Sequence, residues 1–348
     1  MPALVTGATG FLGRHLCREL EEAGHNLVRV SSTNCDLRSE TSLRQFDSQS
    51  FDYIFHLATW TQAGDFCLRH PGEQWLVNQQ INTNLLAWWQ QFQPQAKLVA
   101  MGSSCCYDPA LPLEEKAFLK GEPIESLYAY AMTKRMLYVG MEALRKQYGL
   151  RYLFLVPSTL YGEGYRSDGR QSHFIFDLLR KILEYREDRT RVPVLWGNGR
   201  QSREIVYVED VVQVALGLAP LVDNEIVNVG SGEEHSIRWF AEQIARHAGV
   251  EPEDIQYDTG KYVGAKSKLL SIDKLLGLLP DYRPTSAEAG LKQLVESALP
   301  PLGLLAADHE SNCTPQGAAN GSTRSSSGEC AQEHRTCHPG DTVEIEDA

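Results

Sequence analysis

Long apolar runs are missing from this chain of 348 residues. A membrane-spanning helix needs about 20 consecutive apolar residues, and no segment approaches that length. The first predicted strand begins directly after Met1, which leaves no room for a signal peptide. We therefore expect a cytoplasmic protein. With 42% apolar and 22% charged residues, the chain has the composition of a soluble globular protein with one large or two ordinary cores.

A cysteine framework is also missing. The eight cysteines are scattered, so reduced thiols are expected rather than a disulfide scaffold. Cys330, His334, Cys337 and His338 lie close together near the C-terminus, but no paired Cys-x-x-Cys frame accompanies them. A solvated tail with incidental thiols is therefore favoured over a metal site, and no metal is expected.

The chain has no excess of positive charge. Its net charge of -12 argues against a nucleic-acid partner, which would need a basic surface. Half of this charge lies in the segment 306–348, which holds eight acidic and two basic residues. The same segment is rich in Ser, Gly, Thr and Asn and cannot offset its ordering entropy by apolar burial, so it is predicted to be disordered.

A glycine pattern dominates the first 22 residues. A short apolar run, residues 3–5, is followed by Gly7, Gly10 and Gly13 and then by apolar residues at helical spacing. Glycines allow a tight turn and a close approach of the backbone to a diphosphate, while the free N–H groups of a helix N-terminus attract phosphate. An ordinary Gly-rich turn remains the alternative, but the position between strand and helix favours a dinucleotide site.

The predicted second strand, residues 27–30, bears on the choice of cofactor. NAD-preferring folds place an acidic residue at the end of this strand, where it binds the ribose hydroxyls. Here Ser31 and Ser32 follow the strand, and Asp36 is the first carboxylate beyond it. We expect NADP(H), with NAD(H) held through Asp36 or backbone groups as the alternative.

Two further strands, residues 51–58 and 97–101, are expected to end at the same edge of the sheet. Residues 60–64 should line the cofactor cleft there, and His56 is interpreted as a structural histidine. The second strand delivers Ser103, Ser104, Cys105 and Cys106 to this edge.

Tyr130 and Lys134 are four residues apart on a predicted helix, so their side chains share one face. A nearby ammonium stabilises the phenolate, which lets Tyr130 exchange a proton with a carbonyl or hydroxyl group. Ser103 can donate a hydrogen bond to the same oxygen. A Tyr-x-x-x-Lys pair alone is common on solvated helices, but after the glycine turn it indicates redox chemistry on a carbonyl.

The segments TGxxGFLG and VPSTLYG resemble the extended short-chain dehydrogenase/reductase (SDR) superfamily. The resemblance implies a doubly wound parallel α/β sheet of the Rossmann type that binds NADP(H) or NAD(H). It also implies that the cofactor contacts Gly7, Thr9, Gly10, Phe11, Leu12, Gly13, Ser31, Ser32, Asp36, Leu57, Ala58, Thr59, Tyr130, Lys134, Pro157, Thr159 and Leu160.

Within this superfamily, GSSCCY, AYAMTK, SHFIFDLLRK and LWGNGRQSRE look like segments of the GDP-L-fucose synthases, which epimerise C3 and C5 and reduce C4 of a GDP-4-keto-6-deoxy sugar. Cys105 and His173 fall on the positions that handle the epimerisations. A C4 ketone acidifies the protons on C3 and C5, and a thiol and an imidazole titrate close enough to neutrality to move them. Expected substrate-binding residues are Ser104, Lys181, Trp196, Arg203 and Lys266, with Lys181 and Arg203 as diphosphate clamps.

Two alternatives stay open at this point. The segments 59–78 and 263–272 depart from the fucose synthase pattern, which leaves an NDP-sugar 4-ketoreductase or 4-epimerase without 3,5-epimerisation compatible with the sequence. The other alternative is a non-catalytic NAD(P)-binding scaffold or sensor, against which Ser103, Tyr130 and Lys134 argue. Sugar-nucleotide dehydratases are disfavoured because they carry Thr-Asp-Glu where Ser104, Cys105 and Cys106 stand.

The expected organisation has two domains. Residues 1–162 and 203–222 form the NADP(H)-binding domain, residues 163–202 and 223–300 form a smaller discontinuous domain for the nucleotide sugar, and 306–348 form the tail. The long helices that begin near Gln74 and Tyr130 are the expected interface of a homodimer.

Overall fold

The structure is a computed structural model that describes residues 1–62, 66–165, 173–260 and 266–299. The tail 306–348, Gly64 of the expected cleft segment, the start of the helix expected at 172 and residues 263–265 lie outside the described residues. Among the described helices, none combines the length and apolar character needed to cross a membrane.

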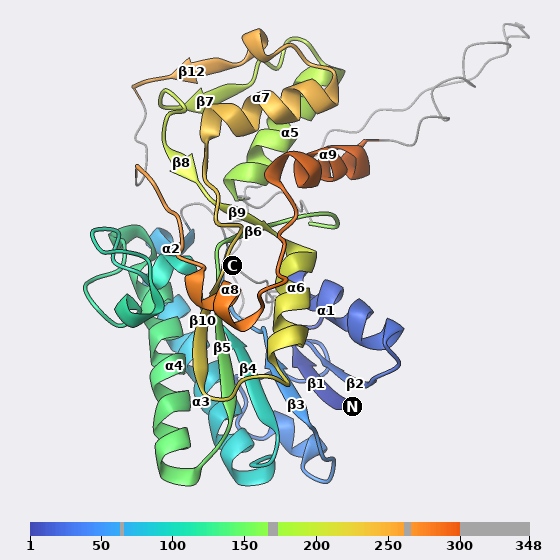
Figure 1. Cartoon of the computed structure of the whole chain (residues 1–348), viewed down its shortest axis with the longest axis vertical. Helices are drawn as coiled ribbons and strands as arrows, with labels where there is room; N and C mark the ends of the chain where they lie inside the picture. The colour runs from blue at the N-terminus through green and yellow to red at the C-terminus, as the bar shows by residue number, and fades with distance from the viewer. Residues whose placement is uncertain (63–65, 166–172, 261–265, 300–348) are drawn as a thin grey trace, which may run out of the picture. The chain divides into compact units, whose positions relative to one another are not determined.

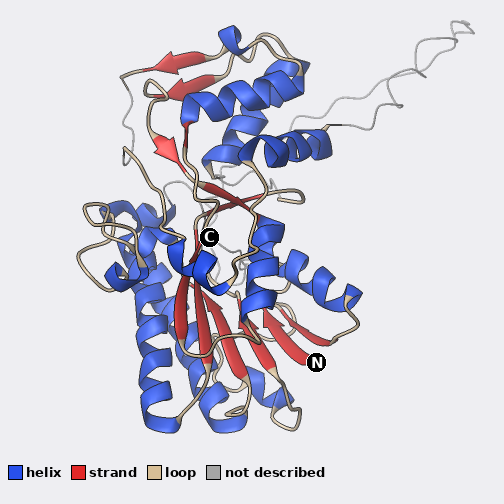
Figure 2. Ribbon diagram, in the orientation of Figure 1, coloured by secondary structure: helices blue, strands red, loops and turns tan. Residues whose placement is uncertain are grey.

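A six-stranded parallel sheet forms the centre of the fold, and it confirms the predicted doubly wound α/β class (Figures 1 and 2). The strand order is β10-β5-β4-β3-β1-β2. The bounds are β1 Pro2–Thr6, β2 Asn26–Val30, β3 Tyr53–His56, β4 Lys97–Met101, β5 Tyr152–Pro157 and β10 Glu225–Val229. Every residue of β4 and β5 is buried, as expected for strands covered on both faces.

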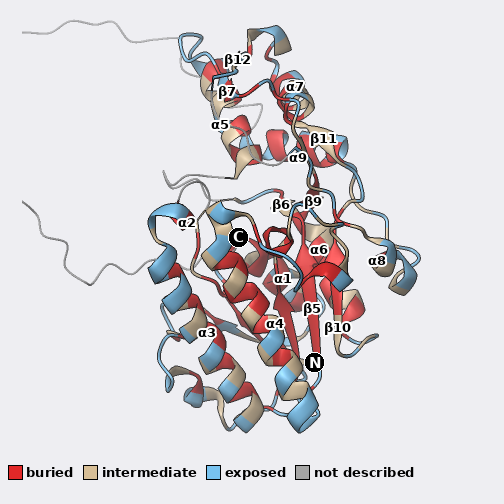
Figure 3. Cartoon of the chain, turned by 90° about the vertical axis from the view of Figure 1, so that its left-hand side faces the viewer, coloured by how far each residue is buried: buried red, intermediate tan, exposed pale blue. Residues whose placement is uncertain are grey.

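Helices cover both faces of this sheet. On one face α3 (Pro71–Phe92) packs against α4 (Tyr128–Tyr148), and on the other α1 (Phe11–Glu22) packs against α6 (Val208–Leu218) (Figure 1). Helix α4 ends at Gly149, whose φ of 72° is the left-handed conformation that terminates a helix. Buried residues follow the strands and the inner sides of the helices, while α3 and α4 expose their outer sides (Figure 3).

Strand β10 corrects the predicted domain division. Residues 225–231 were expected in the second domain, but β10 pairs in parallel with β5 and forms the edge of the central sheet. Helix α8 (Asp273–Leu278) contacts β10 and joins it through Lys274, whose Nζ lies 2.6 Å from Glu225 Oε2. The pattern of an isolated apolar strand does not reveal which sheet it joins, because that choice depends on partners distant in sequence.

The remaining elements are smaller. Helix α7 (Ile237–Ala248) contacts both α5 (Phe174–Glu187) and α9 (Ala287–Ala298). Short strand pairs accompany them: β6 (Thr159–Tyr161) with β9 (Ile205–Tyr207), β7 (Val194–Trp196) with β12 (Gln256–Asp258), and β8 (Ser202–Arg203) with β11 (His235–Ser236). Strand β6 lies within the segment VPSTLYG and forms there because it finds a parallel partner in β9.

Candidate functional site

The glycine turn after β1 is closely packed against the end of β3. Gly7 has a φ of +68°, and a Cβ there would lie 2.7 Å from the amide nitrogen of Ala58. A Cβ on Gly13 would lie 2.0 Å from the carbonyl oxygen of Gly7. Only glycine fits either position, so the sequence spacing produces the tight strand-turn-helix unit that was predicted. Because β2 and β3 flank β1 on opposite sides, the turn lies where the strand order reverses.

A pocket opens beside this turn. Predicted cofactor residues Gly7, Thr9, Ser31, Ser32 and Ala58 line it, and it offers the backbone of the turn together with hydroxyl groups at the end of β2. Gly10 is the N-cap residue of helix α1, and no side chain caps this end of the helix. The first N–H groups of α1 are therefore available to a phosphate. These features fit a dinucleotide. Residues that sequence reasoning missed are Val30, Cys35 and Leu37, which complete the lining.

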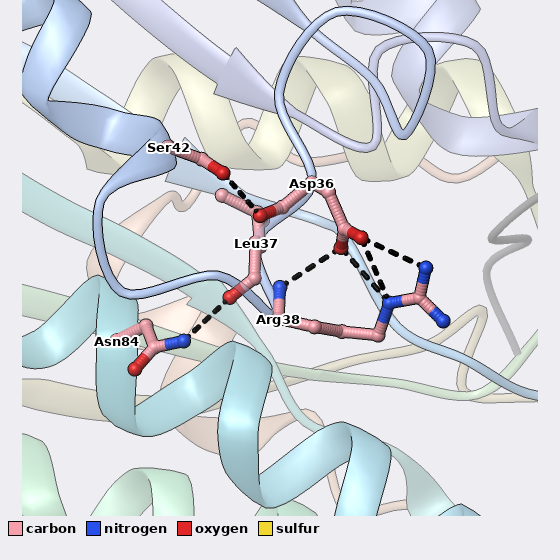
Figure 4. A network of polar contacts seen from close by, with 5 residues as sticks. All are labelled: Asp36, Leu37, Arg38, Ser42 and Asn84. Carbon is pink, nitrogen blue, oxygen red and sulfur yellow. Dashed lines mark hydrogen bonds and ion pairs between the residues drawn. The ribbon is translucent and has the colours of Figure 1, made fainter.

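The carboxylate of Asp36 is occupied by a neighbouring arginine (Figure 4). Arg38 Nε lies 2.9 Å from Asp36 Oδ1, and Arg38 Nη2 lies 2.8 Å from Oδ2. These hydrogen bonds lower the pKa of Asp36. The same turn is fixed by Asn84, whose amide donates to the Leu37 carbonyl at 2.9 Å, and by Ser42, which donates to the Asp36 carbonyl at 2.6 Å. Asp36 is thus an ion-paired group beside the pocket.

His56 has the features of a structural histidine. Its side chain is buried, and its ring nitrogens lie 2.9 Å from Thr6 Oγ1 and 3.1 Å from Asn82 Oδ1. Burial lowers its pKa to about 3, so the ring is neutral near pH 7. Thr6 Oγ1 also accepts the amide hydrogens of Leu57 and Ala58 at 3.2 Å, which fixes the backbone after β3.

Tyr130 and Lys134 lie together on α4, as their spacing predicts. Their exposed fractions are 2% and 5%, and Lys134 Nζ lies 5.8 Å from the centroid of the Tyr130 ring. Thr133 between them turns its hydroxyl back to the Tyr130 carbonyl at 2.7 Å, away from this face. The buried ammonium is placed to favour the tyrosinate form of its neighbour.

The thiol pair stands at the end of β4. Ser103 caps a single 3-10 turn, η2 (Ser104–Cys106), and its Oγ accepts the amide hydrogen of Cys105 at 3.3 Å. Arg135 on α4 donates to the Cys106 carbonyl at 2.9 Å and also bonds the carbonyls of residues 120 and 121. The residue after Lys134 therefore ties the cysteine turn to the helix that carries Tyr130.

Lys268 connects the two groups predicted to move protons. The pKa of Cys105 is lowered, first by a hydrogen bond from the Cys106 thiol and then by the charge of Lys268. Burial raises the pKa of Cys106, so this thiol keeps its proton and can donate it. The pKa of His173 falls to about 4 because of burial and the charge of Lys268. Lys268 was not predicted as a site residue.

The predicted substrate residues divide into two groups. Lys181 Nζ lies 2.8 Å from Asp177 Oδ2 and 3.2 Å from the Val194 carbonyl, so its ammonium is partly compensated. Trp196 exposes 60% of its surface on β7. Arg203 on β8 is half-buried, and its charge adds to burial in lowering the pKa of Lys268. Lys266 is exposed, and its carbonyl accepts the amide hydrogen of Ser202 at 2.9 Å.

The other predicted residues lie at the start of α1, after β3, in η2, at the end of β5 and in β6. Pro157 ends β5, and Ser158 continues the sheet by donating its amide hydrogen to the Val229 carbonyl at 2.9 Å. Residues predicted to contact cofactor or substrate that are buried or half-buried in these segments are Phe11, Leu12, Thr59, Ser104, Thr159 and Leu160. The charge of Lys268 thus acts on both Cys105 and His173, and the charge of Lys134 also acts on Cys105.

Comparison with known proteins agrees with this geometry. Residues 3–230 match the sequence profile of the family described as "NAD dependent epimerase/dehydratase family". A GDP-L-fucose synthase from Sinorhizobium fredii is 36% identical over 207 residues, which cover 58% of this chain and 64% of that protein. A dTDP-4-dehydro-6-deoxy-D-allose reductase from Streptomyces is 27% identical over 313 residues, 83% of this chain and 94% of that protein. The crystal structure of a GDP-L-fucose synthetase from Naegleria fowleri bound to NADP superposes with a TM-score of 0.75 at 24% identity, covering 85% of this chain and 93% of that one.

Proposed function

Because the chain belongs to the NAD-dependent epimerase/dehydratase family, we propose that it reduces the C4 ketone of a nucleotide-diphosphate 4-keto-6-deoxy sugar with NADPH, and that it also inverts C3 and C5 of this sugar. It is an enzyme of the SDR type. GDP is the favoured nucleotide, since a GDP-L-fucose synthase is among the relatives. The observation that carries the proposal is the buried Tyr130-Lys134 pair on α4, which Arg135 of the same helix ties to the turn of Cys105 and Cys106.

The pocket beside the glycine turn would hold the cofactor, and we favour NADP(H) over NAD(H). The two serines after β2 line the pocket and can donate hydrogen bonds to a 2′-phosphate. The first carboxylate beyond them, Asp36, is ion-paired with Arg38. The positive charge of Arg38 offsets the repulsion between this carboxylate and a 2′-phosphate. When bound, the reduced nicotinamide supplies the hydride that reaches C4.

The chain's own residues manage the proton at the C4 oxygen. Tyr130 donates its phenolic proton to the oxygen as the ketone becomes an alcohol. The ammonium of Lys134 then stabilises the tyrosinate, and Ser103 donates a hydrogen bond to the same substrate oxygen. Burial of Tyr130 and Lys134 strengthens these interactions because water does not screen them.

Cys105 and His173 manage the protons on carbon. Inversion of one centre needs a base that removes a proton from one face and an acid that returns a proton to the opposite face. The pair enters the reaction with one proton, which the Cys105 thiol holds beside a neutral His173. The imidazole that removes a proton in the first inversion then donates it in the second, and the thiolate left by the first inversion is the base of the second. Two inversions then restore the starting protonation of the pair, and the C4 ketone holds the negative charge as an enolate in between.

Deuterium incorporation tests this assignment. In D2O, Cys105→Ser is expected to bind NADPH normally but to lose deuterium wash-in at C3 and C5 by at least about 100-fold, a typical size for general acid-base catalysis. Cys17→Ala, which alters another buried cysteine, on α1, serves as the control and is expected to exchange like the parent enzyme. Undiminished exchange in Cys105→Ser would remove this thiol from the mechanism.

Reduction without epimerisation is the second candidate, and the similarity to a 4-keto-6-deoxy sugar reductase favours it. In that case the parent enzyme in D2O gives a reduced sugar with protium retained at C3 and C5. Tyr130→Phe is expected to abolish the reduction. The same mass spectra therefore separate the two candidates.

A further inference from the structure

Glu204 is a buried carboxylate that the proposed mechanism does not use. It lies between β8 and β9 and exposes 2% of its surface. Its Oε1 accepts the amide hydrogen of Gly232 at 2.9 Å, and its Oε2 accepts that of Leu270 at 3.1 Å. Burial raises its pKa to about 7. A buried acidic group is costly to keep, so its hydrogen bonds indicate what it holds in place.

Two of the backbone groups that Glu204 binds belong to the segment that carries Lys268. The amide nitrogen of Glu204 donates to the Lys268 carbonyl at 3.3 Å, and its carboxylate binds the amide of Leu270 two residues later. A Cβ on Gly230 would lie 2.3 Å from Oε1, so the carboxylate fits tightly against the backbone there and has little freedom to move.

A second anchor holds the far end of the same segment. Asn228 is buried, and its side-chain Nδ2 donates to the Ser271 carbonyl at 3.0 Å. Its Oδ1 accepts the hydroxyl hydrogen of Tyr107 at 2.6 Å, two residues after Cys105. The segment that carries Lys268 is thus fixed to the cysteine turn beyond residue 270, while Glu204 fixes it around residue 268 itself.

We propose that Glu204 is the positioning residue for Lys268: its amide and its carboxylate bind the backbone at residues 268 and 270, and so fix the place from which the charge of Lys268 acts on Cys105. The inference rests on the proposed function in taking Cys105 and Lys268 as parts of the active site. The ionised carboxylate is the form that can accept both amide hydrogens. An amide side chain at position 204 would direct its own N–H toward one of these donors and release that side of the segment.

The thiolate of Cys105 reports on this arrangement without any substrate. The titratable groups that face Cys105 are Cys106 beside it, Cys67 on α2 (Phe66–Arg69), Lys134 on α4 and Lys268. The experiment measures the pH dependence of iodoacetamide alkylation of Cys105 in the full-length protein, with the modified peptide quantified by mass spectrometry. The ultraviolet absorbance of the thiolate, taken against Cys105→Ser, provides a second readout.

Lys268→Met is expected to slow Cys105 alkylation by about tenfold at about pH 5, below the pKa of this thiol, which corresponds to one unit in pKa. Glu204→Gln is expected to slow it to a similar extent, because without the anchor the Lys268 ammonium no longer stays near the thiol. The double variant is expected to be no slower than Lys268→Met alone, because both changes act through the same ammonium. Asp210→Asn is the matched control: Asp210 also accepts a backbone amide hydrogen, from Thr285 at 2.8 Å, without contacting the Lys268 segment.

Two results would overturn the proposal. One is a Glu204→Gln protein that is folded by circular dichroism and alkylates Cys105 at the parent rate. The other is a double variant whose loss is the sum of the single losses, which would indicate a general effect on the fold. Because no sugar nucleotide is present, a failed turnover assay would refute the proposed function while leaving this result standing, and the reverse also holds.

Discussion

At the scale of single residues, the site depends on charges and protons held in buried positions. Tyr130, Lys134 and Cys105 all expose 5% of their surface or less. In such surroundings an ammonium or a hydrogen-bond donor acts on its neighbour with little screening, which is how a thiol can become a base near neutral pH.

The same burial makes His56 a source of acid sensitivity. Its pKa is about 3 in the folded protein against an ordinary value of 6.5, so the unfolded chain binds the proton more readily. The stability that His56 contributes is therefore complete above pH 6.5 and is lost as the pH falls toward 3. Over this window the contribution changes by up to about 1.4 kcal/mol per pH unit.

His56→Gln is accordingly expected to flatten the decline in the free energy of unfolding between pH 6.5 and 4, measured by urea denaturation at several pH values. His15 and His173, whose pKa values are also lowered by burial, keep part of the slope in the variant. His70→Gln is the control, because 41% of that side chain is exposed. An unchanged slope in His56→Gln would show that this ring is not the buried neutral group described here.

Some site residues could be predicted from the sequence and others could not. Tyr130 and Lys134 follow from local spacing on one helix, since four residues complete about one turn. Lys268 and Glu204 were missed because their partners lie in distant segments and only the folded chain brings them together. The available signal was Lys268 in the segment 263–272, but Lys266 two residues earlier looked equivalent in the sequence.

At the scale of elements, the glycine turn is the feature on which the cofactor pocket depends. Position 7 must meet two independent requirements: its backbone is left-handed, and it must lack a Cβ because the chain after β3 packs against it. Gly24, between α1 and β2, has a similar φ of +73° but nothing within 4 Å of a Cβ. Comparing alanine substitutions at Gly7 and Gly24 therefore separates the cost of a left-handed backbone from the cost of close packing.

Gly7→Ala is expected to lower the free energy of unfolding by more than Gly24→Ala, for which about 1 to 2 kcal/mol of left-handed strain is the whole cost. It should also abolish NADPH binding, measured by fluorescence titration, whereas Gly24→Ala should bind NADPH like the parent protein. Equal stability losses in the two variants, with cofactor binding retained, would contradict the packing shown for the turn.

Most elements were predictable to within a few residues, because their periodicity and their glycine and proline boundaries are local signals. The assignment of β10 to the central sheet and the strand β6 were not. Both depend on a partner strand, β5 or β9, and a run such as Glu225–Val229 carries no record of its partner.

At the scale of the whole molecule, the outer sides of α3 and α4 remain the predicted dimer interface. Leu76 on α3 exposes 62% of its surface, and Tyr128 and Tyr148 on α4 expose 44% and 50%. Apolar side chains exposed on neighbouring helices are typical of surfaces that are covered in an assembly.

Leu76→Glu is expected to convert a dimer into a monomer, or to weaken it at least about tenfold, as measured by size-exclusion chromatography with light scattering, because a carboxylate would be buried without a partner. Leu221→Glu is the matched control, since Leu221 exposes the same 62% but follows α6 on the other side of the sheet. A parent protein that is monomeric at micromolar concentration would refute the interface.

The central claim is tested most directly by the mass of one product. The purified protein is incubated in D2O with NADPH and GDP-4-keto-6-deoxymannose, and the sugar nucleotide is analysed by mass spectrometry. The account predicts a 4-hydroxy sugar that carries solvent deuterium at both C3 and C5. An unreduced sugar with no NADPH consumed, although the protein is folded and binds NADPH, would contradict it for this substrate.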